Sequence, residues 1–196
     1  MKVIVITGST RGIGFGLAKA FLERGCVVAI SGRSKASVDK AVTELGMLDR
    51  VLGQPCDMID VAQVKALWDA TIARFGHVDV WINNAGVGQN SVKFVDLTAE
   101  EIRVIVDTNM LGCMYGSQVA LRGMLAQGSG QLYNMEGFGS DGSVRATLEV
   151  YGTTKRGVRY FTRSLVGLDP IYWSEKVRHY GLEWEMTSEP CRTSTT

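Results

Sequence analysis

Short apolar segments alternate with longer amphipathic segments along most of this chain. The apolar segments are rich in β-branched residues, which is typical of parallel strands buried on both faces. They predict five strands, at Val3–Ile6, Cys26–Ser31, Val51–Pro55, Val78–Ile82 and Gly130–Met135.

The amphipathic segments space their apolar residues three and four positions apart, as a helix with one buried face does. They predict helices over Phe15–Arg24, Ser37–Leu45, Asp60–Phe75, Thr98 to about Gln127, and Val150–Leu168. Strands that alternate with helices predict an α/β fold with a doubly wound parallel sheet, the Rossmann fold, in a single domain.

A glycine-rich turn joins the first predicted strand to the first predicted helix. Without Cβ atoms its glycines let the backbone turn tightly and approach a ligand, and the N–H groups at the helix start attract phosphate. A tight turn without a ligand is the alternative. The predicted cofactor-binding residues of this turn are Gly8, Ser9, Thr10, Arg11, Gly12, Ile13 and Gly14.

The end of the second predicted strand indicates which dinucleotide would bind. An acidic residue there binds the adenosine ribose hydroxyls, whereas an arginine accommodates a 2′-phosphate. Here the chain reads Gly32-Arg33-Ser34, with no carboxylate before Asp39. We therefore expect Arg33 and Ser34 to bind NADP(H), with Arg33 as an ordinary surface charge as the alternative.

Three residues in the predicted helices carry candidate chemistry. Tyr151 and Lys155 are four residues apart and share a helix face, where a cation favours the phenolate and lowers the tyrosine pKa towards the range of acid–base catalysis. Asn109 lies in mid-helix despite its poor helix propensity. It is either an exposed polar position or a residue with a function.

The turn TGSTRGIG, the sequence Asn83-Asn84-Ala85-Gly86 and the Tyr-x-x-x-Lys pair together resemble the short-chain dehydrogenase/reductase family, over residues 3 to about 168. The resemblance implies that Asp57 contacts the adenine ring and that Asn84, Ala85 and Gly86 lie along the cofactor, although an Asn-Gly-rich segment can also be a plain turn. It also implies that Asn109 holds a relay water, that Tyr151 donates a proton, and that Lys155 binds the nicotinamide ribose.

The chain departs from the family pattern before the tyrosine. Most members carry a serine thirteen residues before it, where this chain has Phe138; the closest hydroxyl is Ser140, our candidate donor to a substrate carbonyl. The segment NMEGFGSDG, residues 134–142, resembles the chlorophyll b reductase branch. That resemblance implies reduction of the 7-formyl group of chlorophyll b to 7-hydroxymethyl with NADPH, in the chloroplast.

The end of the chain also departs from the family. Residues 169–196 contain neither a β-branched run nor a Pro-Gly pair. We expect residues 1–168 to form the NADP-binding domain and residues 169–196 to form an atypical, disordered tail. One or two family strands would then be missing, and the fifth strand would be an exposed edge.

The composition and charge of the chain limit which kinds of partner we expect it to bind. A net charge of +1 without a basic run argues against nucleic acid, and no apolar run approaches a membrane span. Cys26, Cys56, Cys113 and Cys191 are scattered, without a nearby histidine at metal-ligand spacing, so we expect no metal and reduced thiols in an intracellular compartment. The first strand begins at Val3, so we expect no transit peptide within this chain.

Three functions follow from these observations. The first is an NADPH-dependent carbonyl reductase acting on a small molecule, with chlorophyllide b or chlorophyll b as the leading substrate and a homo-oligomer as its expected assembly. The second is a truncated, inactive NADP-binding domain that acts as a binding or assembly partner. The third is a family member acting on a different aldehyde, ketone or alcohol.

Overall fold

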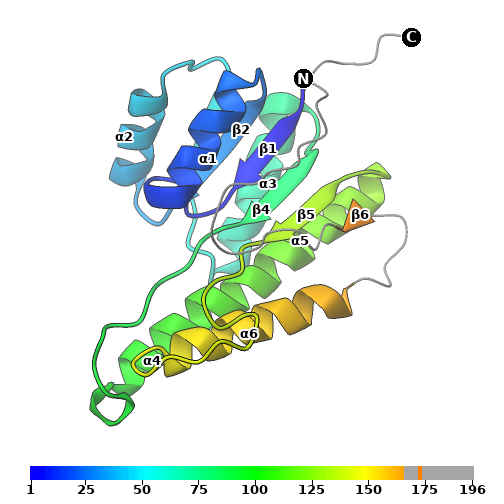
Figure 1. The fold of residues 1–196 in the computed structure, drawn as a ribbon. Coiled ribbons are helices and arrows are strands. Elements are labelled where there is room, and N and C mark those ends of the chain that lie inside the picture. Colours follow the sequence, from blue (N-terminus) through cyan, green and yellow to red (C-terminus); the bar gives the residue numbers. More distant parts are fainter. Residues whose placement is uncertain (166–171, 174–196) are drawn as a thin grey trace.

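The strands form one parallel sheet with helices on both faces, as Figure 1 shows. The computed structural model describes residues 1–165 and 172–173. The strand order is β3-β2-β1-β4-β5-β6, and all five neighbouring pairs are parallel. The strands are β1 (Val3–Ile6), β2 (Val27–Gly32), β3 (Val51–Pro55), β4 (Val80–Asn83), β5 (Gln131–Asn134) and β6 (Tyr172–Trp173). The predicted doubly wound fold is confirmed, and its order reverses between β1 and β4.

Alternate side chains of each inner strand enter different halves of the core. The helices are α1 (Gly12–Glu23), α2 (Lys35–Leu45), α3 (Val61–Phe75), α4 (Ala99–Val106), α5 (Gly112–Gln127) and α6 (Glu149–Ser164). Ile4 and Ile6 of β1 pack with helices α1 and α2, while Val5 packs with α3 and α5. A 3₁₀ turn, η1 (Phe94–Asp96), precedes α4. No helix in residues 1–165 or 172–173 is long and apolar enough to cross a bilayer.

The long helix predicted from Thr98 to Gln127 is interrupted. Thr98 and Glu101 form a capping box at its start, but a π-helical segment, η2 (Asp107–Leu111), separates α4 from α5. Asn109 lies inside this segment and is buried. Because π-helical turns insert an extra residue into a helix and occur often at functional sites, the prediction of one continuous helix is wrong at a position that carries candidate chemistry.

The prediction that β5 is an exposed edge is also wrong. The two-residue strand β6 pairs with β5 in parallel, with Tyr172 opposite Gln131 and Trp173 opposite Leu132. Two residues leave too short a pattern to be recognised in the sequence. The rest of the predicted tail, and the last residues of the helix predicted to end at Leu168, lie outside the described residues.

The cysteines follow the prediction in part. Cys56 and Cys113 are free and buried, as expected. Cys26 is buried but disulfide-bonded, so the prediction of a reduced thiol is wrong there.

Candidate active site

The glycine-rich turn after β1 and the loop after β4 are fixed to one another. The side-chain amide of Asn84 donates to the carbonyls of Thr7 (2.9 Å) and Gly8 (3.0 Å). The hydroxyl of Thr7 accepts from the backbone N–H groups of Asn84 and Ala85, each at 3.0 Å. Dinucleotides bind where the strand order reverses in such sheets, so this junction has the right place in the fold for one.

Glycine is required at two positions of this contact. Gly8 has a φ of +60°, and a Cβ there would lie 2.7 Å from the Cα of Ala85. A Cβ on Gly14 would overlap the side-chain nitrogen of Asn84. The two glycines therefore let the turn lie directly against the Asn84–Gly86 loop.

The other residues of the turn divide into buried and exposed groups. Ser9 is buried, donates to the carbonyl of Ile6 (2.6 Å) and accepts from the N–H of Ser31 (3.0 Å), so its hydroxyl holds the turn to β2. Thr10 is half-buried. Arg11, Gly12 and Ile13 are exposed at the start of α1, where no side chain caps the helix. No capping side chain therefore uses the first N–H groups of α1.

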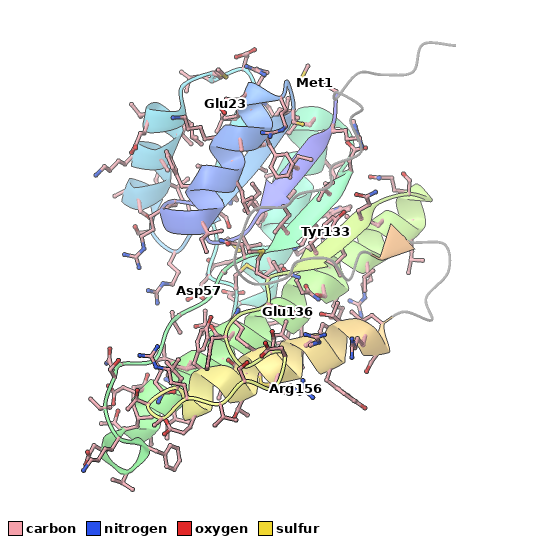
Figure 2. All side chains as sticks on the ribbon, in the orientation of Figure 1. Met1, Glu23, Asp57, Tyr133, Glu136 and Arg156 are labelled. Atoms are coloured by element: carbon pink, nitrogen blue, oxygen red, sulfur yellow. The ribbon has the colours of Figure 1, made fainter. Side chains whose placement is uncertain are left out.

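Three residues predicted to bind the adenosine half follow β2 and β3. Arg33 is exposed directly after β2. Ser34 caps α2 and accepts from the N–H of Ser37 (3.3 Å). Asp57 is half-buried and accepts from the N–H of Ile59 (3.3 Å). Asp57 lies at the carboxyl ends of the strands, as does Glu136 (Figure 2).

Asn109 joins three elements through its side chain. Its oxygen accepts from the N–H of Val87 (2.8 Å), and its nitrogen donates to the carbonyl of Val87 (3.0 Å) and to the hydroxyl of Thr154 (3.1 Å). Both N–H groups of the amide are therefore used. Asn109 is not the exposed residue of the alternative interpretation; it ties the loop after β4 to α6.

Tyr151 and Lys155 share a face of α6, as their spacing predicts. The Lys155 ammonium lies 5.8 Å from the centre of the Tyr151 ring and donates to the carbonyl of Met135 (2.9 Å). Lys155 is buried, and this burial lowers its pKa below the usual value, while the nearby Cys113 and Glu136 act in the opposite direction.

One cavity of about 270 Å³ brings these segments together. It is lined by residues from the start of α1, the loop after β4, the segment directly after β5, and α6. The lining residues are Ile13, Asn84, Gly86, Val87, Gly88, Met135, Glu136, Tyr151 and Lys155. Residues predicted from three separate motifs thus meet at one cavity.

The segment after β5 contains two residues that the sequence did not single out as functional. Glu136 lines the cavity, with Arg159 3.5 Å away. A Cβ on Gly137 would overlap the hydroxyl of Tyr151, so Gly137 is a position that faces this hydroxyl. An acidic residue at the end of a strand was the available signal for Glu136, whereas the contact of Gly137 needs the three-dimensional structure.

Ser140 is buried in the same segment. Its N–H donates to the carbonyl of Gly137 (3.0 Å), and its carbonyl accepts from Arg156 (2.9 Å). Within the described part of the chain, the cavity lining does not include Ser140. Its role as a donor to a substrate carbonyl stays a prediction.

Several known proteins resemble this chain. The chlorophyll(ide) b reductase NOL, chloroplastic, of Oryza sativa subsp. japonica is 40% identical over 167 residues, which cover 83% of this chain and 49% of that protein. The probable chlorophyll(ide) b reductase NYC1, chloroplastic, of Arabidopsis thaliana is 37% identical, covering 83% of this chain and 37% of that protein. The chain thus spans about half or less of the length of these relatives.

Solved structures of other proteins have the same fold as this chain. A 3-ketoacyl-(acyl-carrier-protein) reductase from Brucella melitensis, complexed with NADH, has a TM-score of 0.78 and 32% identity, covering 84% of this chain and 68% of its own. An alcohol dehydrogenase from Thermococcus sibiricus, complexed with 5-hydroxy-NADP, has a TM-score of 0.79 and 27% identity, covering 88% and 74%. Residues 2–167 match the family described as short chain dehydrogenase. The chain belongs to the short-chain dehydrogenase family.

Proposed function

We propose that this chain is the reductase domain of an NADPH-dependent carbonyl reductase, with the formyl group of chlorophyll b or chlorophyllide b as its substrate. The observation that carries the proposal is the cavity that Tyr151 and Lys155 line together with Gly86 of the loop after β4. The similarity to chlorophyll(ide) b reductases supports the substrate and a chloroplast location.

The residues around the glycine-rich turn fit a dinucleotide. Gly8 and Gly14 let the turn pack directly against the Asn84–Gly86 loop, and the uncapped start of α1 offers N–H groups to a pyrophosphate. Arg33 would bind the 2′-phosphate and Asp57 the adenine ring, with Thr10, Arg11 and Ser34 beside them. When bound, NADPH supplies the hydride that reaches the carbonyl carbon.

The protein supplies the proton. Tyr151 donates its phenolic proton to the carbonyl oxygen, so that hydride and proton together convert the aldehyde to an alcohol. Lys155, fixed by the carbonyl of Met135, stabilises the resulting phenolate and holds the nicotinamide ribose. Because both N–H groups of the Asn109 amide are already used, we propose that the relay water donates to an oxygen of Asn109.

A second candidate substrate class rests on a separate similarity. The NADP-dependent (R)-specific alcohol dehydrogenase of Lentilactobacillus kefiri is 34% identical over 167 residues. Simple ketones and secondary alcohols therefore belong in the test. A purely binding, inactive domain is the outcome if no substrate reacts.

The test is NADPH oxidation by the purified chain with chlorophyllide b, a simple aldehyde and a simple ketone. We expect turnover with chlorophyllide b, and a loss of about 100-fold or more in the Tyr151→Phe variant, because only the proton donor is removed. The dissociation constant for NADPH should stay within about twofold, since the ring is retained. Near-normal turnover by Tyr151→Phe would identify another acid, and turnover with the ketone alone would exclude the proposed substrate.

A further inference from the structure

Helix α6, which carries Tyr151 and Lys155, begins without a capping side chain of its own sequence. The residue before its first turn is Leu148, which makes no side-chain cap. The first N–H groups of a helix have no carbonyl partner within that helix. An acceptor for them must therefore come from elsewhere.

Gln89 provides that acceptor from a distant part of the chain. Its side-chain oxygen accepts from the N–H of Val150 (3.0 Å) and from the N–H of Tyr151 (3.1 Å). Its side-chain nitrogen donates to the carboxylate of Glu149 (3.1 Å). Gln89 is only 9% exposed, so water competes little for these bonds.

The loop that contains Gln89 is the loop proposed to bind the cofactor. Three residues before Gln89, Gly86 lines the cavity beside Tyr151. Both the N–H and the carbonyl of Val87 are hydrogen-bonded to the side chain of Asn109. The Asn109 amide in turn donates to the hydroxyl of Thr154 in α6. The loop is thus tied to α6 at two successive turns, through Gln89 at the first and through Asn109 at the next.

We propose that Gln89 is a positioning residue that fixes Tyr151 relative to the cofactor loop. It accepts a hydrogen bond from the main-chain N–H of Tyr151 itself, so its loss would act directly on the position of the proposed proton donor. This inference rests on the proposed function insofar as Tyr151 is the proton donor. Small displacements of a reacting group lower the rate steeply.

The test begins with two variants. Gln89→Met keeps the side-chain length but removes both polar groups, and it should lower kcat about tenfold or more. The dissociation constant for NADPH should change less than about twofold, since the phosphate-binding turn is unaltered. Thr98→Ala, which removes the exposed cap of α4, is the matched control for the loss of a helix cap and should leave kcat unchanged.

A rescue separates positioning from general destabilisation. Gln89→Glu alone places two carboxylates together and should be as impaired as Gln89→Met. Combined with Glu149→Gln, it exchanges the donor and the acceptor of the bond and restores the contact, so kcat should return to within about twofold of the original protein. Failure of this rescue, or an equal loss of kcat in Thr98→Ala, would overturn the inference.

A readout without activity keeps this inference distinct from the proposed function. Amide hydrogen exchange at Val150 and Tyr151 reports the Gln89 bonds directly, because no carbonyl of the helix protects these groups. Exchange at both should be about fivefold or more faster in Gln89→Met, as expected for the loss of a cap, and normal in the double variant. A protein that reduces no substrate would refute the proposed function, whereas unchanged exchange in Gln89→Met would refute the role of Gln89.

Discussion

Two single residues, one after β2 and one after β5, are proposed to influence what the site can bind. Arg33 is exposed at the carboxyl end of β2, and Gly137 faces the Tyr151 hydroxyl. One position adds a charge where the adenosine end of a dinucleotide would lie, and the other keeps a side chain out where the reacting group would lie. Each can be tested by one substitution.

Arg33→Ala should weaken NADPH binding about tenfold or more, because a hydrogen bond to a charged group contributes roughly 1.5–3 kcal/mol. NADH lacks the 2′-phosphate, so its dissociation constant should stay within about twofold. Fluorescence titration with both cofactors measures the difference. Lys35→Ala, an exposed cation two residues away, is the control, and equal losses for NADPH and NADH would contradict the assignment.

Gly137→Ala should lower kcat about tenfold or more, because the added Cβ would overlap the Tyr151 hydroxyl and lie 3.0 Å from two carbons of Lys155. Gly16→Ala is the matched control, since a Cβ there meets no atom of the described chain within 4 Å. Steady-state kinetics of both variants decides the matter. Equal activity of the two variants would mean that Tyr151 tolerates a side chain at its hydroxyl.

The candidate site illustrates which residue placements a sequence can reveal. Tyr151 and Lys155 were predictable because both lie on one helix, where spacing alone defines the face. Gly137 and Gln89 were not, because their contacts join segments that the chain separates by many residues. Ser9 was predictable as part of the turn, but not its internal hydrogen bonds to the ends of β1 and β2.

Between whole elements, a buried polar cluster holds the sheet to its helices. Asn83 of β4 donates to the hydroxyl of Ser117 in α5 (2.9 Å) and to the side chain of Asn134 in β5 (2.8 Å). Asn134 in turn donates to Thr162 of α6 (3.0 Å), and the indole N–H of Trp81 donates to Asn83 (2.8 Å). The position of α6 relative to the sheet therefore depends on fully paired polar groups as well as on apolar packing.

Asn83→Leu should lower the free energy of unfolding by roughly 2–4 kcal/mol, because it leaves several buried donors and acceptors without partners. Urea unfolding measures this loss, and the slope of the free energy of unfolding against urea concentration should stay unchanged. Asn90→Ala, an exposed asparagine bonded to Glu101, should change stability by less than about 0.5 kcal/mol. A similar stability of both variants would show that water replaces the lost bonds.

Elements were predictable to the extent that their pattern was long and regular. The five strands predicted from apolar runs are all present, because a buried strand needs a continuous apolar segment. The π-helical segment was not predictable, since the amphipathic spacing on either side of it reads as one helix. The strand β6 contains only two residues, too few for any periodicity.

Over the whole molecule, the residues proposed to bind the cofactor come from segments between β1 and α6, and the cavity joins both halves of the sheet. A ligand that contacts so many segments binds the folded state far better than the unfolded chain. Its binding should therefore be visible in the stability of the entire fold.

NADPH at about 100 times its dissociation constant should stabilise the protein by roughly 2.7 kcal/mol. A thermal melt with and without the cofactor measures the shift as a higher Tm. Arg33→Ala at the same NADPH concentration should show a smaller shift, because less of it is bound. No shift at saturating NADPH would contradict a cofactor site in this fold.

The bonds among Thr7, Gly8 and Asn84 have a consequence for how such a protein can diversify. Hydrogen bonds between protein groups hold the glycine-rich turn against the loop after β4. This side of the cavity is therefore pre-organised, and the backbone there needs little further ordering when a ligand binds. The segment between β5 and α6, which borders the other end of the cavity, takes no part in these bonds. New substrate preferences can therefore arise there by exchange of one segment, while the half proposed to bind the nucleotide is left intact.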